Sequence, residues 1–228
     1  IWLDTFSLDI DHSFLAFIAD GKIGFITDSG VIAIPPKYEH AIGVDPTMYG
    51  FSCELARVKY KGLWGFINKN DEFVIEPKFI DTGLYFDPGQ PLMVKIDDKL
   101  GFIDNQGNVV IAPKYVWDEL HGMFKDGQAY VKLSSADPSQ VIDSKGGVLI
   151  TPPTPVTYLD IFRSGQSNYV FRYNKKLGLI NAENEVIAPA HYDWIGDTIK
   201  HVNLICMKRG DMYGLIDING RRVLDPVS

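Results

Sequence analysis

The chain has 228 residues, of which 46% are apolar and 22% are charged, as is ordinary for a globular protein. Its net charge of −7, with no basic stripe, makes nucleic acid an unexpected partner. No apolar run approaches the roughly 18 residues of a membrane span, so membrane insertion is not expected. The sequence begins at Ile1 rather than Met, which indicates processing or trimming, and both cytoplasmic and exported or periplasmic locations stay open.

A short unit of glycine, an aromatic or aliphatic residue and isoleucine returns along the whole chain. Its spacings are 41, 36, 39, 38 and 36 residues. A fixed period of this size is typical of a modular array. We therefore expect one domain over residues 1–228, built from six repeats of about 38 residues. The repeat anchors are Gly24, Gly65, Gly101, Gln140, Gly178 and Gly214.

Three strands are predicted within each repeat, in chain order. The first is an alternating, β-rich run before the anchor, such as residues 56–60 or 92–96. A tight turn leads to the second strand, which contains the anchor. A further turn, with Asp or Asn first and Gly, Asp or Asn fourth, predicts a type I turn with a bulge. The acids of that turn, such as Asp104, Asp143 and Asp217, are therefore interpreted as turn-forming rather than catalytic residues.

The third strand follows this turn, as in residues 73–75 and 109–111, and a proline comes directly after it. Because proline lacks the N–H that extends a ladder of hydrogen bonds, we expect the third strand to end there. The prolines concerned are Pro36, Pro77, Pro113, Pro152, Pro189 and Pro226.

These motifs resemble the WG-repeat family, also called KWG repeats. The best match is copy 2, from Lys61-Gly62-Leu63-Trp64-Gly65-Phe66-Ile67 to Phe79, and the resemblance covers the whole chain. Copy 4 departs most, with Ser139-Gln140 at the Trp-Gly position. The resemblance implies a bacterial, all-β, non-enzymatic repeat domain. It transfers no catalytic residues.

Two architectures fit the repeats. The opening segment, residues 1–4, resembles the missing tail of copy 6, so an N-terminal strand that completes the last repeat could close a ring. Apolar residues on both faces of the strands also favour a six-bladed β-propeller. The alternative is an open β-solenoid of stacked hairpins.

Two insertions that break the repeat are the candidate partner-binding loops, because loops carry function on a repeated scaffold. They cover residues 45–51 and 85–91 and are rich in aromatic residues, proline and glycine. The candidate contact residues are Met48, Tyr49, Phe51, Tyr85 and Phe86.

Tryptophans recur 16 residues after the anchor, with Trp2 at the equivalent position if copy 6 continues into the N-terminus. Exposed aromatics in one phase could stack on sugars, whereas buried ones would be packing residues. The candidate stacking residues are Trp2, Trp117 and Trp194.

Three polar clusters that are not repeated are the candidate catalytic or metal sites. They are Asp9-Asp11-His12, Asp118-Glu119-His121 and His191-Asp193. The histidines have no zinc-type spacing, and no phosphate loop or nucleophile elbow occurs. We expect neither a metal, a cofactor nor a catalytic residue, and no disulfide between Cys53 and Cys206.

The sequence thus favours a non-catalytic protein-interaction scaffold that binds a protein partner. A module for carbohydrate or cell-envelope binding is the first alternative, and a propeller-type hydrolase is the second.

Overall fold

The computed structural model of the chain describes residues 10–11, 13–41, 49–84, 88–117, 123–124, 126–137, 139–151, 158–161, 168–199 and 201–227. These residues form 23 β-strands and no helix, which confirms the predicted all-β fold. Two compact units divide the chain, one of residues 1–129 and 144–146 and one of residues 130–143 and 147–228. The single domain predicted from the repeats stays a prediction. In the described part, no helix is long and apolar enough to cross a membrane.

The first twelve strands belong to unit 1. They are β1 (Ile10–Asp11), β2 (Phe14–Ala19), β3 (Lys22–Thr27), β4 (Ile32–Glu39), β5 (Phe51–Ser52), β6 (Leu55–Tyr60), β7 (Leu63–Ile67), β8 (Phe73–Phe79), β9 (Asp81–Thr82), β10 (Leu92–Ile96), β11 (Lys99–Ile103) and β12 (Val109–Val116).

The unit boundary runs through β13, and the later strands belong to unit 2. They are β13 (Gln128–Val131), β14 (Gln140–Asp143), β15 (Val148–Ile150), β16 (Tyr158–Ile161), β17 (Tyr169–Tyr173), β18 (Lys176–Ile180), β19 (Val186–Tyr192), β20 (Trp194–Ile199), β21 (Leu204–Arg209), β22 (Met212–Asp217) and β23 (Arg222–Val227).

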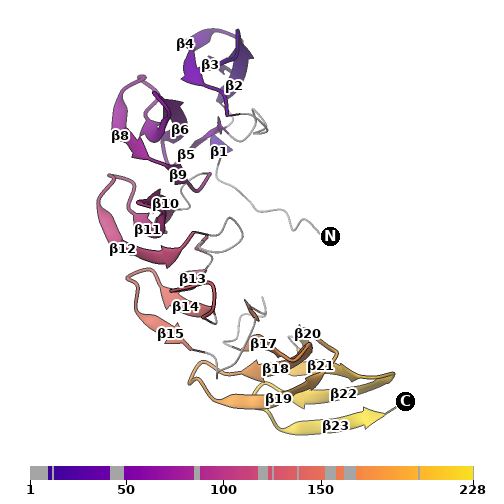
Figure 1. Ribbon diagram of the computed structural model, residues 1–228. Helices are drawn as coiled ribbons and strands as arrows, with labels where there is room; N and C mark the ends of the chain where they lie inside the picture. The colour runs from indigo at the N-terminus through magenta and orange to yellow at the C-terminus, as the bar shows by residue number, and fades with distance from the viewer. Residues whose placement is uncertain are drawn as a thin grey trace. The chain divides into compact units, whose positions relative to one another are not determined.

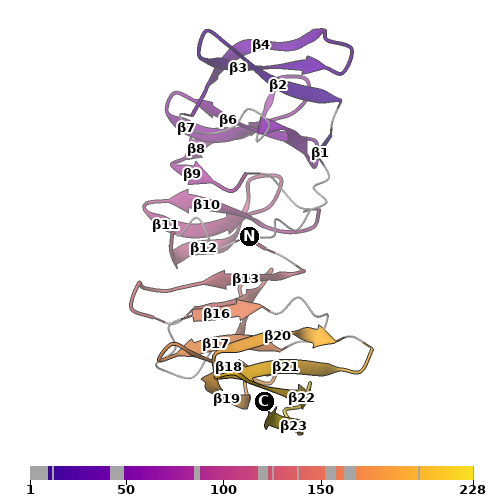
Figure 2. The ribbon, with the colours of Figure 1, turned by 90° about the vertical axis from the view of Figure 1, so that its right-hand side faces the viewer.

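Each complete repeat is an antiparallel meander of four strands. Strands β9–β12, β16–β19 and β20–β23 form such sheets, with sequence neighbours hydrogen-bonded in order (Figure 1). In Figure 2, β20–β22 of the last sheet can be followed as adjacent antiparallel strands. The fourth strand, which precedes the three predicted ones, was not predicted from the sequence, and its length varies, with six residues in β20. In β9 it has only two residues.

Both faces of the strands are covered, as the sequence pattern predicted. In β11, Leu100, Phe102 and Ile103 are all fully buried although neighbours in a strand point to opposite faces. In the described part of unit 1, a large cluster of buried apolar residues lies around Phe25 and Phe66. The described part of unit 2 contains smaller clusters, such as those around Ile205 and Phe171.

The third strand of the repeat runs through its proline, so the prediction that it ends there is wrong. In copy 2, Trp64 pairs with Phe79 and Phe66 pairs with Ile75. Three residues of β8, centred on Pro77, therefore face the single residue between Trp64 and Phe66, and this makes a bulge. A bulge leaves residues unpaired, so the missing N–H of proline costs no ladder bond there.

The anchor glycine is required by this bulge. A Cβ on Gly65 would lie 2.6 Å from the carbonyl oxygen of Ile75 and 2.7 Å from the nitrogen of Pro77. A Cβ on Gly24 would meet the equivalent two backbone atoms at 2.7 and 2.8 Å, and one on Gly178 would meet the equivalent carbonyl oxygen, that of Ala188, at 2.7 Å. The glycine therefore lets the bulged third strand approach the second strand more closely than any side chain allows.

Copy 4, whose anchor is not glycine, has a shorter third strand. Gln140 stands at the anchor, and β15 has only three residues and ends at Ile150, before Pro152. The third strands of copies 1, 2 and 3 have eight, seven and eight residues.

The predicted turns are confirmed. Asp104 accepts hydrogen bonds at 2.9 Å from the backbone N–H groups of Gln106 and Asn108. The fourth residue of the turn has a positive φ whether it is glycine, as in Gly107 (84°), or Asp71 (65°). The sequence pattern thus identified both the position and the conformation of this turn.

The same fourth turn residue also joins consecutive repeats. A Cβ on Gly107 would lie 3.1 Å from the Ile75 side chain of the preceding repeat, and Gly146 stands similarly against Ile111. In copy 2 the residue is Asp71, which accepts a hydrogen bond of 2.6 Å from the hydroxyl of Tyr38 and pairs with Lys37.

At the contact between copies 1 and 2 a tyrosine lies opposite an acid. At the contact between copies 2 and 3 the same two positions hold phenylalanine and glycine. The residue equivalent to Tyr38 is Phe79, and the turn that follows it has Gly107 in place of an acid. Tyr115 comes next in the series, but its turn residue is Gly146. Its buried hydroxyl accordingly has no hydrogen-bond partner among the described residues.

The described part of the N-terminus joins copy 2. Strand β1 pairs with β5, with Ile10 opposite Ser52. The segment predicted to complete the last repeat, residues 1–4, lies outside the described residues. Ring closure, and hence a six-bladed propeller rather than an open solenoid, stays a prediction.

We expect Gly65→Ala to lower the free energy of unfolding by about 2–3 kcal/mol, because only backbone atoms stand in the way of the new methyl group. Gly147→Ala is the matched control. Its methyl group would meet only the mobile carboxylate of Asp143, and other repeats carry Val31 or Glu72 at this position. Urea unfolding followed by circular dichroism measures both; equal losses would contradict the proposed role of the anchor.

Tyr38→Phe and Tyr115→Phe should have opposite consequences. The first removes a hydrogen bond to a carboxylate and should cost about 1–3 kcal/mol of unfolding free energy. The second removes a buried hydroxyl without a partner and should be neutral or stabilise the fold by up to about 1 kcal/mol. The same urea experiment compares them, and a larger loss for Tyr115→Phe would refute the matching of tyrosine with acid.

The contribution of Tyr38 should depend on alkaline pH. Burial, followed by the hydrogen bond to and the charge of Asp71, raises the pKa of Tyr38 above its ordinary value near 10.0. The unfolded chain therefore loses this proton first, and the stabilisation is complete below about pH 10 and declines above it. The difference in unfolding free energy between the wild type and Tyr38→Phe should stay constant up to about pH 9 and shrink between about pH 10 and pH 12. A constant difference would show that the phenol titrates normally.

Candidate ligand-binding site

The described candidates of the first predicted contact loop, Tyr49 and Phe51, are buried. Tyr49 is 1% exposed and Phe51 is 0% exposed, and both belong to the core of unit 1. Tyr49 stacks against Trp64 with ring centroids 6.3 Å apart. Because their rings fill the core, neither residue offers a surface to a partner, contrary to the expectation from the sequence. The other three candidates, Met48, Tyr85 and Phe86, lie outside the described residues.

The phased tryptophans are not equivalent in exposure. Trp194 is 47% exposed, and its ring lies against the backbone of Gly196, where a Cβ would be 2.4 Å from the indole. Trp117 is half-buried, and Trp2 lies outside the described residues. Trp117 and Trp194 belong to different units. Of the three, Trp194 is the one that the structure places as an exposed aromatic surface.

Asp193, from the polar cluster that the structure describes, has a structural role. Asp193 accepts a hydrogen bond of 2.8 Å from the backbone N–H of Gly210 and pairs with Lys176. The hydrogen bond from Lys176, and then the one from Gly210, lower the pKa of Asp193. Glu39, at the same place in copy 1, accepts a bond of 3.0 Å from Gly62 of the next repeat. These acids therefore fix the first turn of the following repeat.

The other two clusters lie largely outside the described residues: Asp9, His12, Asp118, Glu119 and His121. Among the residues that the structure does describe, no group of three His, Cys, Asp or Glu side chains is placed to hold a metal ion.

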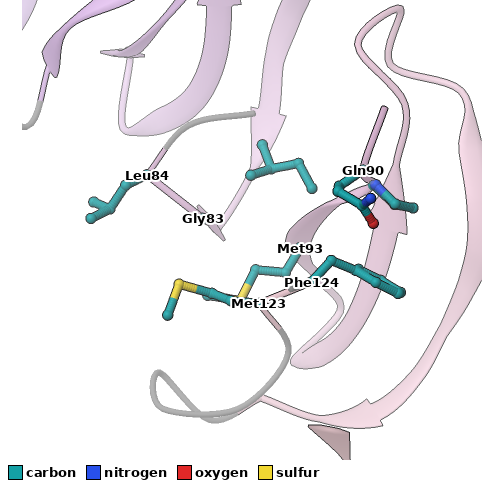
Figure 3. A pocket seen from close by; sticks show the side chains of 8 residues that line it. Gly83, Leu84, Gln90, Met93, Met123 and Phe124 are labelled. Carbon is teal, nitrogen blue, oxygen red and sulfur yellow. The ribbon is translucent and has the colours of Figure 1, made fainter. Parts of the chain in front are cut away.

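An apolar cavity lies where the copy 3 insertion leaves and rejoins the sheet. Its volume is about 40 Å³, and Figure 3 shows the side chains around it. Gly83 and Leu84 follow β9, and the residues from Gln90 onward lead into β10. The lining residues are Gly83, Leu84, Gln90, Pro91, Leu92, Met93, Met123 and Phe124.

Packing explains the shape of this cavity. The backbone N–H of Gly83 donates a hydrogen bond of 2.8 Å to the carbonyl of Met93, which ties the start of the loop to β10. Phe124 packs edge-on against Phe102 at 5.0 Å and closes one side. Met123 is 53% exposed and lies at the rim, where a flexible thioether can adapt to different ligand shapes.

A second cavity of about 290 Å³ shares Gln90 and Pro91 with the first, and its lining includes polar side chains such as Asp104 and Asn105. It lies wholly within unit 1, because Ser144 belongs to that unit. Its lining residues are Cys53, Gly89, Gln90, Pro91, Asp104, Asn105, Val110 and Ser144. The two cavities thus form one site of two parts, which we call the Gln90 site.

A buried cation anchors one wall of the Gln90 site. Arg57 is 6% exposed and lies over the indole of Trp64, with 3.5 Å between its guanidinium carbon and the ring centroid. Its Nη2 donates a hydrogen bond of 2.9 Å to Oδ1 of Asp81 in β9. The same carboxylate oxygen accepts a bond of 2.8 Å from Thr82. Arg57 thereby holds β9, from which the loop departs.

Arg57 breaks the repeat, since Met93 and Cys206 occupy the equivalent positions in copies 3 and 6. Burial lowers its pKa to about 10, although the charge of Asp81 opposes this shift. Within the part of the chain that the structure describes, its Nε has no hydrogen-bond partner. A buried charged pair of this kind fixes the position of the elements that it joins, here β6 and β9, more than it adds to the stability of the fold.

The Gln90 site is suited to binding rather than chemistry. It joins an apolar part that can hold a side chain to a polar part that can hydrogen-bond. The sequence identified the loop, but not Leu84, Met93, Met123 or Phe124. Met93 occupies a repeated strand position, and Met123 and Phe124 come from a segment with no repeat signature.

Solved structures that resemble the chain do so distantly. An eukaryotic initiation factor shares 10% identity over 99% of this chain and 66% of its own, with a TM-score of 0.47. Hsv2 of Kluyveromyces lactis shares 10% over 94% of this chain and 75% of its own, with a TM-score of 0.42. The WD40 β-propeller domain of Doa1 shares 10% over 94% and 68%, with a TM-score of 0.33. No curated protein sequence matches the chain.

The sequence model of the WG containing repeat matches four stretches, residues 23–64, 64–81, 101–134 and 178–208. Together they cover more than half of the 228 residues. They include the anchor glycines of copies 1, 2, 3 and 5, which make the close backbone contacts of the bulge. The chain belongs to the family of proteins built from WG containing repeats.

Proposed function

We propose that this chain is a non-catalytic scaffold that binds a protein partner at the Gln90 site. The observation that carries the proposal is the pair of adjoining cavities formed where an insertion interrupts the repeat. Such insertions are the parts of a repeated scaffold that stacking does not constrain. An apolar cavity beside a few polar groups is the usual composition of a binding site.

A carbohydrate-binding module is the alternative, and the exposed indole of Trp194 supports it. A flat aromatic surface next to a glycine backbone can stack on a sugar ring. The protein-binding proposal is preferred because the Gln90 site adds cavity volume and polar lining side chains, whereas the described surface around Trp194 offers a single aromatic ring.

Met123→Ser should reduce capture of the partner by the tagged chain, because it removes apolar surface at the rim of the cavity. The matched control is Met212→Ser, which changes another exposed methionine, in unit 2. Truncation of an interface contact commonly costs about 1–2 kcal/mol, so recovery should fall roughly fivefold to thirtyfold. Quantitative mass spectrometry of proteins captured from the host lysate measures this change.

Both variants should first be shown to unfold at the same urea concentration as the wild type. A protein retained by Met212→Ser and lost from Met123→Ser supports the proposal. Capture of the same proteins in equal amounts by both variants, or by neither variant nor the wild type, argues against it.

A further inference from the structure

Consecutive repeats pack through opposite faces of their sheets. In one cluster of buried residues, Leu179 and Ala188 of copy 5 pack with Ile205, Met207 and Ile216 of copy 6. The other small cluster described in unit 2 joins copies 4 and 5 in the same way. We call the face of a repeat that carries the counterparts of Leu179 and Ala188 its exit face. The opposite face, which carries the counterparts of Ile205 and Ile216, is its entry face.

The exit face of copy 6 is exposed. Leu224 pairs with Leu215, the residue after the anchor, as its counterparts do in the other copies. Leu224 is 43% exposed, and Tyr213 on the same face is exposed too, although Trp64 and Leu100 are buried at its position. The counterparts of Leu224 in the other five copies are between 0% and 4% exposed: Ile34, Ile75, Ile111, Ile150 and Ala188.

The entry face of copy 1 is exposed as well. Leu15 pairs with Ile26, the isoleucine of the repeated unit, and is 48% exposed. Gly107 and Gly146 press against the preceding repeat, but in the described part of the chain a Cβ on Gly30, at the same place in copy 1, would meet open space. The counterparts of Leu15 in copies 2, 3, 5 and 6 are between 0% and 5% exposed: Ala56, Leu92, Tyr169 and Ile205.

These two exposed faces are the two halves of one kind of contact. Elsewhere in the chain an exit face packs on the entry face of the following repeat. The end repeats of a stacked array normally carry polar outer faces, because such faces keep the array soluble. Here the outer faces carry leucine instead, so each has the composition of a surface that packs against another repeat.

We propose that the exit face of copy 6 binds the entry face of copy 1 in a second molecule of this chain, so that molecules associate head to tail. The contact continues the packing that already joins consecutive repeats. Because the two faces differ, a pair of molecules still has one free face of each kind and can add further molecules. Leu15 and Leu224 line neither cavity of the Gln90 site, so the inference is independent of the proposed function.

A second molecule is favoured over the first repeat of the same chain. Contact within one chain requires the rotations at all the intervening contacts to add up to a full turn. Copy 4 departs from the other copies in its anchor, Gln140, and in the three residues of β15. The sheet of copy 6 already contains four strands, β20–β23, and therefore needs no strand from the opening segment. Association of two molecules requires only one further contact of the kind described.

Three variants of the full chain test the inference. Leu15→Glu places a charge on the entry face, and Leu224→Glu places one on the exit face. Leu63→Glu is the matched control, because Leu63 is 37% exposed and Lys22 and Lys99 stand at its position in copies 1 and 3. All three should first be compared with the wild type in urea unfolding.

Sedimentation equilibrium over a series of protein concentrations then measures self-association. We expect the average mass of the wild type and of Leu63→Glu to rise with concentration above that of a single chain. Each end-face variant should associate at least about thirtyfold more weakly, because the contact would bury an unpaired carboxylate.

A mixture of the two end-face variants distinguishes a head-to-tail contact from a symmetric one. Leu15→Glu keeps its exit face, and Leu224→Glu keeps its entry face. An equimolar mixture should therefore form pairs of molecules with an affinity close to that of the wild type. It should form no larger species, because both outer faces of each pair carry the substitution.

A wild type that stays monomeric at every concentration would overturn the inference. If Leu15→Glu and Leu224→Glu are then less stable than Leu63→Glu, the two faces pack on each other within one chain. Self-association that survives both substitutions, or a mixture that forms no pairs, would also overturn it.

Discussion

One close approach between backbones organises the repeat. At the anchor glycines of copies 1, 2, 3 and 5, the second strand lies against the bulge of the third strand at a distance that excludes a Cβ; on Gly65 it would be 2.6 Å from the carbonyl oxygen of Ile75. The bulge fixes the position of the third strand. Ile75 or Ile111 of that strand then packs against the turn of the next repeat, and this turn leads into the third strand of that repeat. A local steric requirement thereby becomes a contact between neighbouring repeats, which is how repeat proteins gain most of their stability.

The sequence predicted the parts of the fold that arise from local chemistry. The turn at Asp104 follows from hydrogen bonds within five residues, so its residue types are sufficient to identify it. The path of the third strand through Pro77 was mispredicted, because proline is compatible with a strand only where a partner makes a bulge. That partner is Gly65, ten to twelve residues earlier, and the pairing between them is not visible in either residue alone.

The site was predictable in outline and not in detail. An insertion that interrupts a period can be seen in any repeated sequence, and the loop before β10 does line the Gln90 site. The burial of Tyr49 and Phe51 could not be foreseen, since an aromatic residue in a loop can face either solvent or core. The hydrogen bond from Arg57 to Asp81 could not be predicted from the sequence either, because the two residues are 24 positions apart. The sequence did show that Arg57 is unusual, because methionine or cysteine stands at its position in other copies.

Copy 4 combines several weaknesses that have a common consequence. It lacks the anchor glycine, its third strand is short, and it leaves the hydroxyl of Tyr115 without an acceptor. The boundary between the two compact units also falls in this repeat. In a chain of nearest-neighbour contacts, cooperativity is transmitted only through the weakest link. The repeat therefore acts as a break in cooperativity: loss of structure on one side need not spread to the other, and the half with the Gln90 site can vary in sequence without endangering the rest.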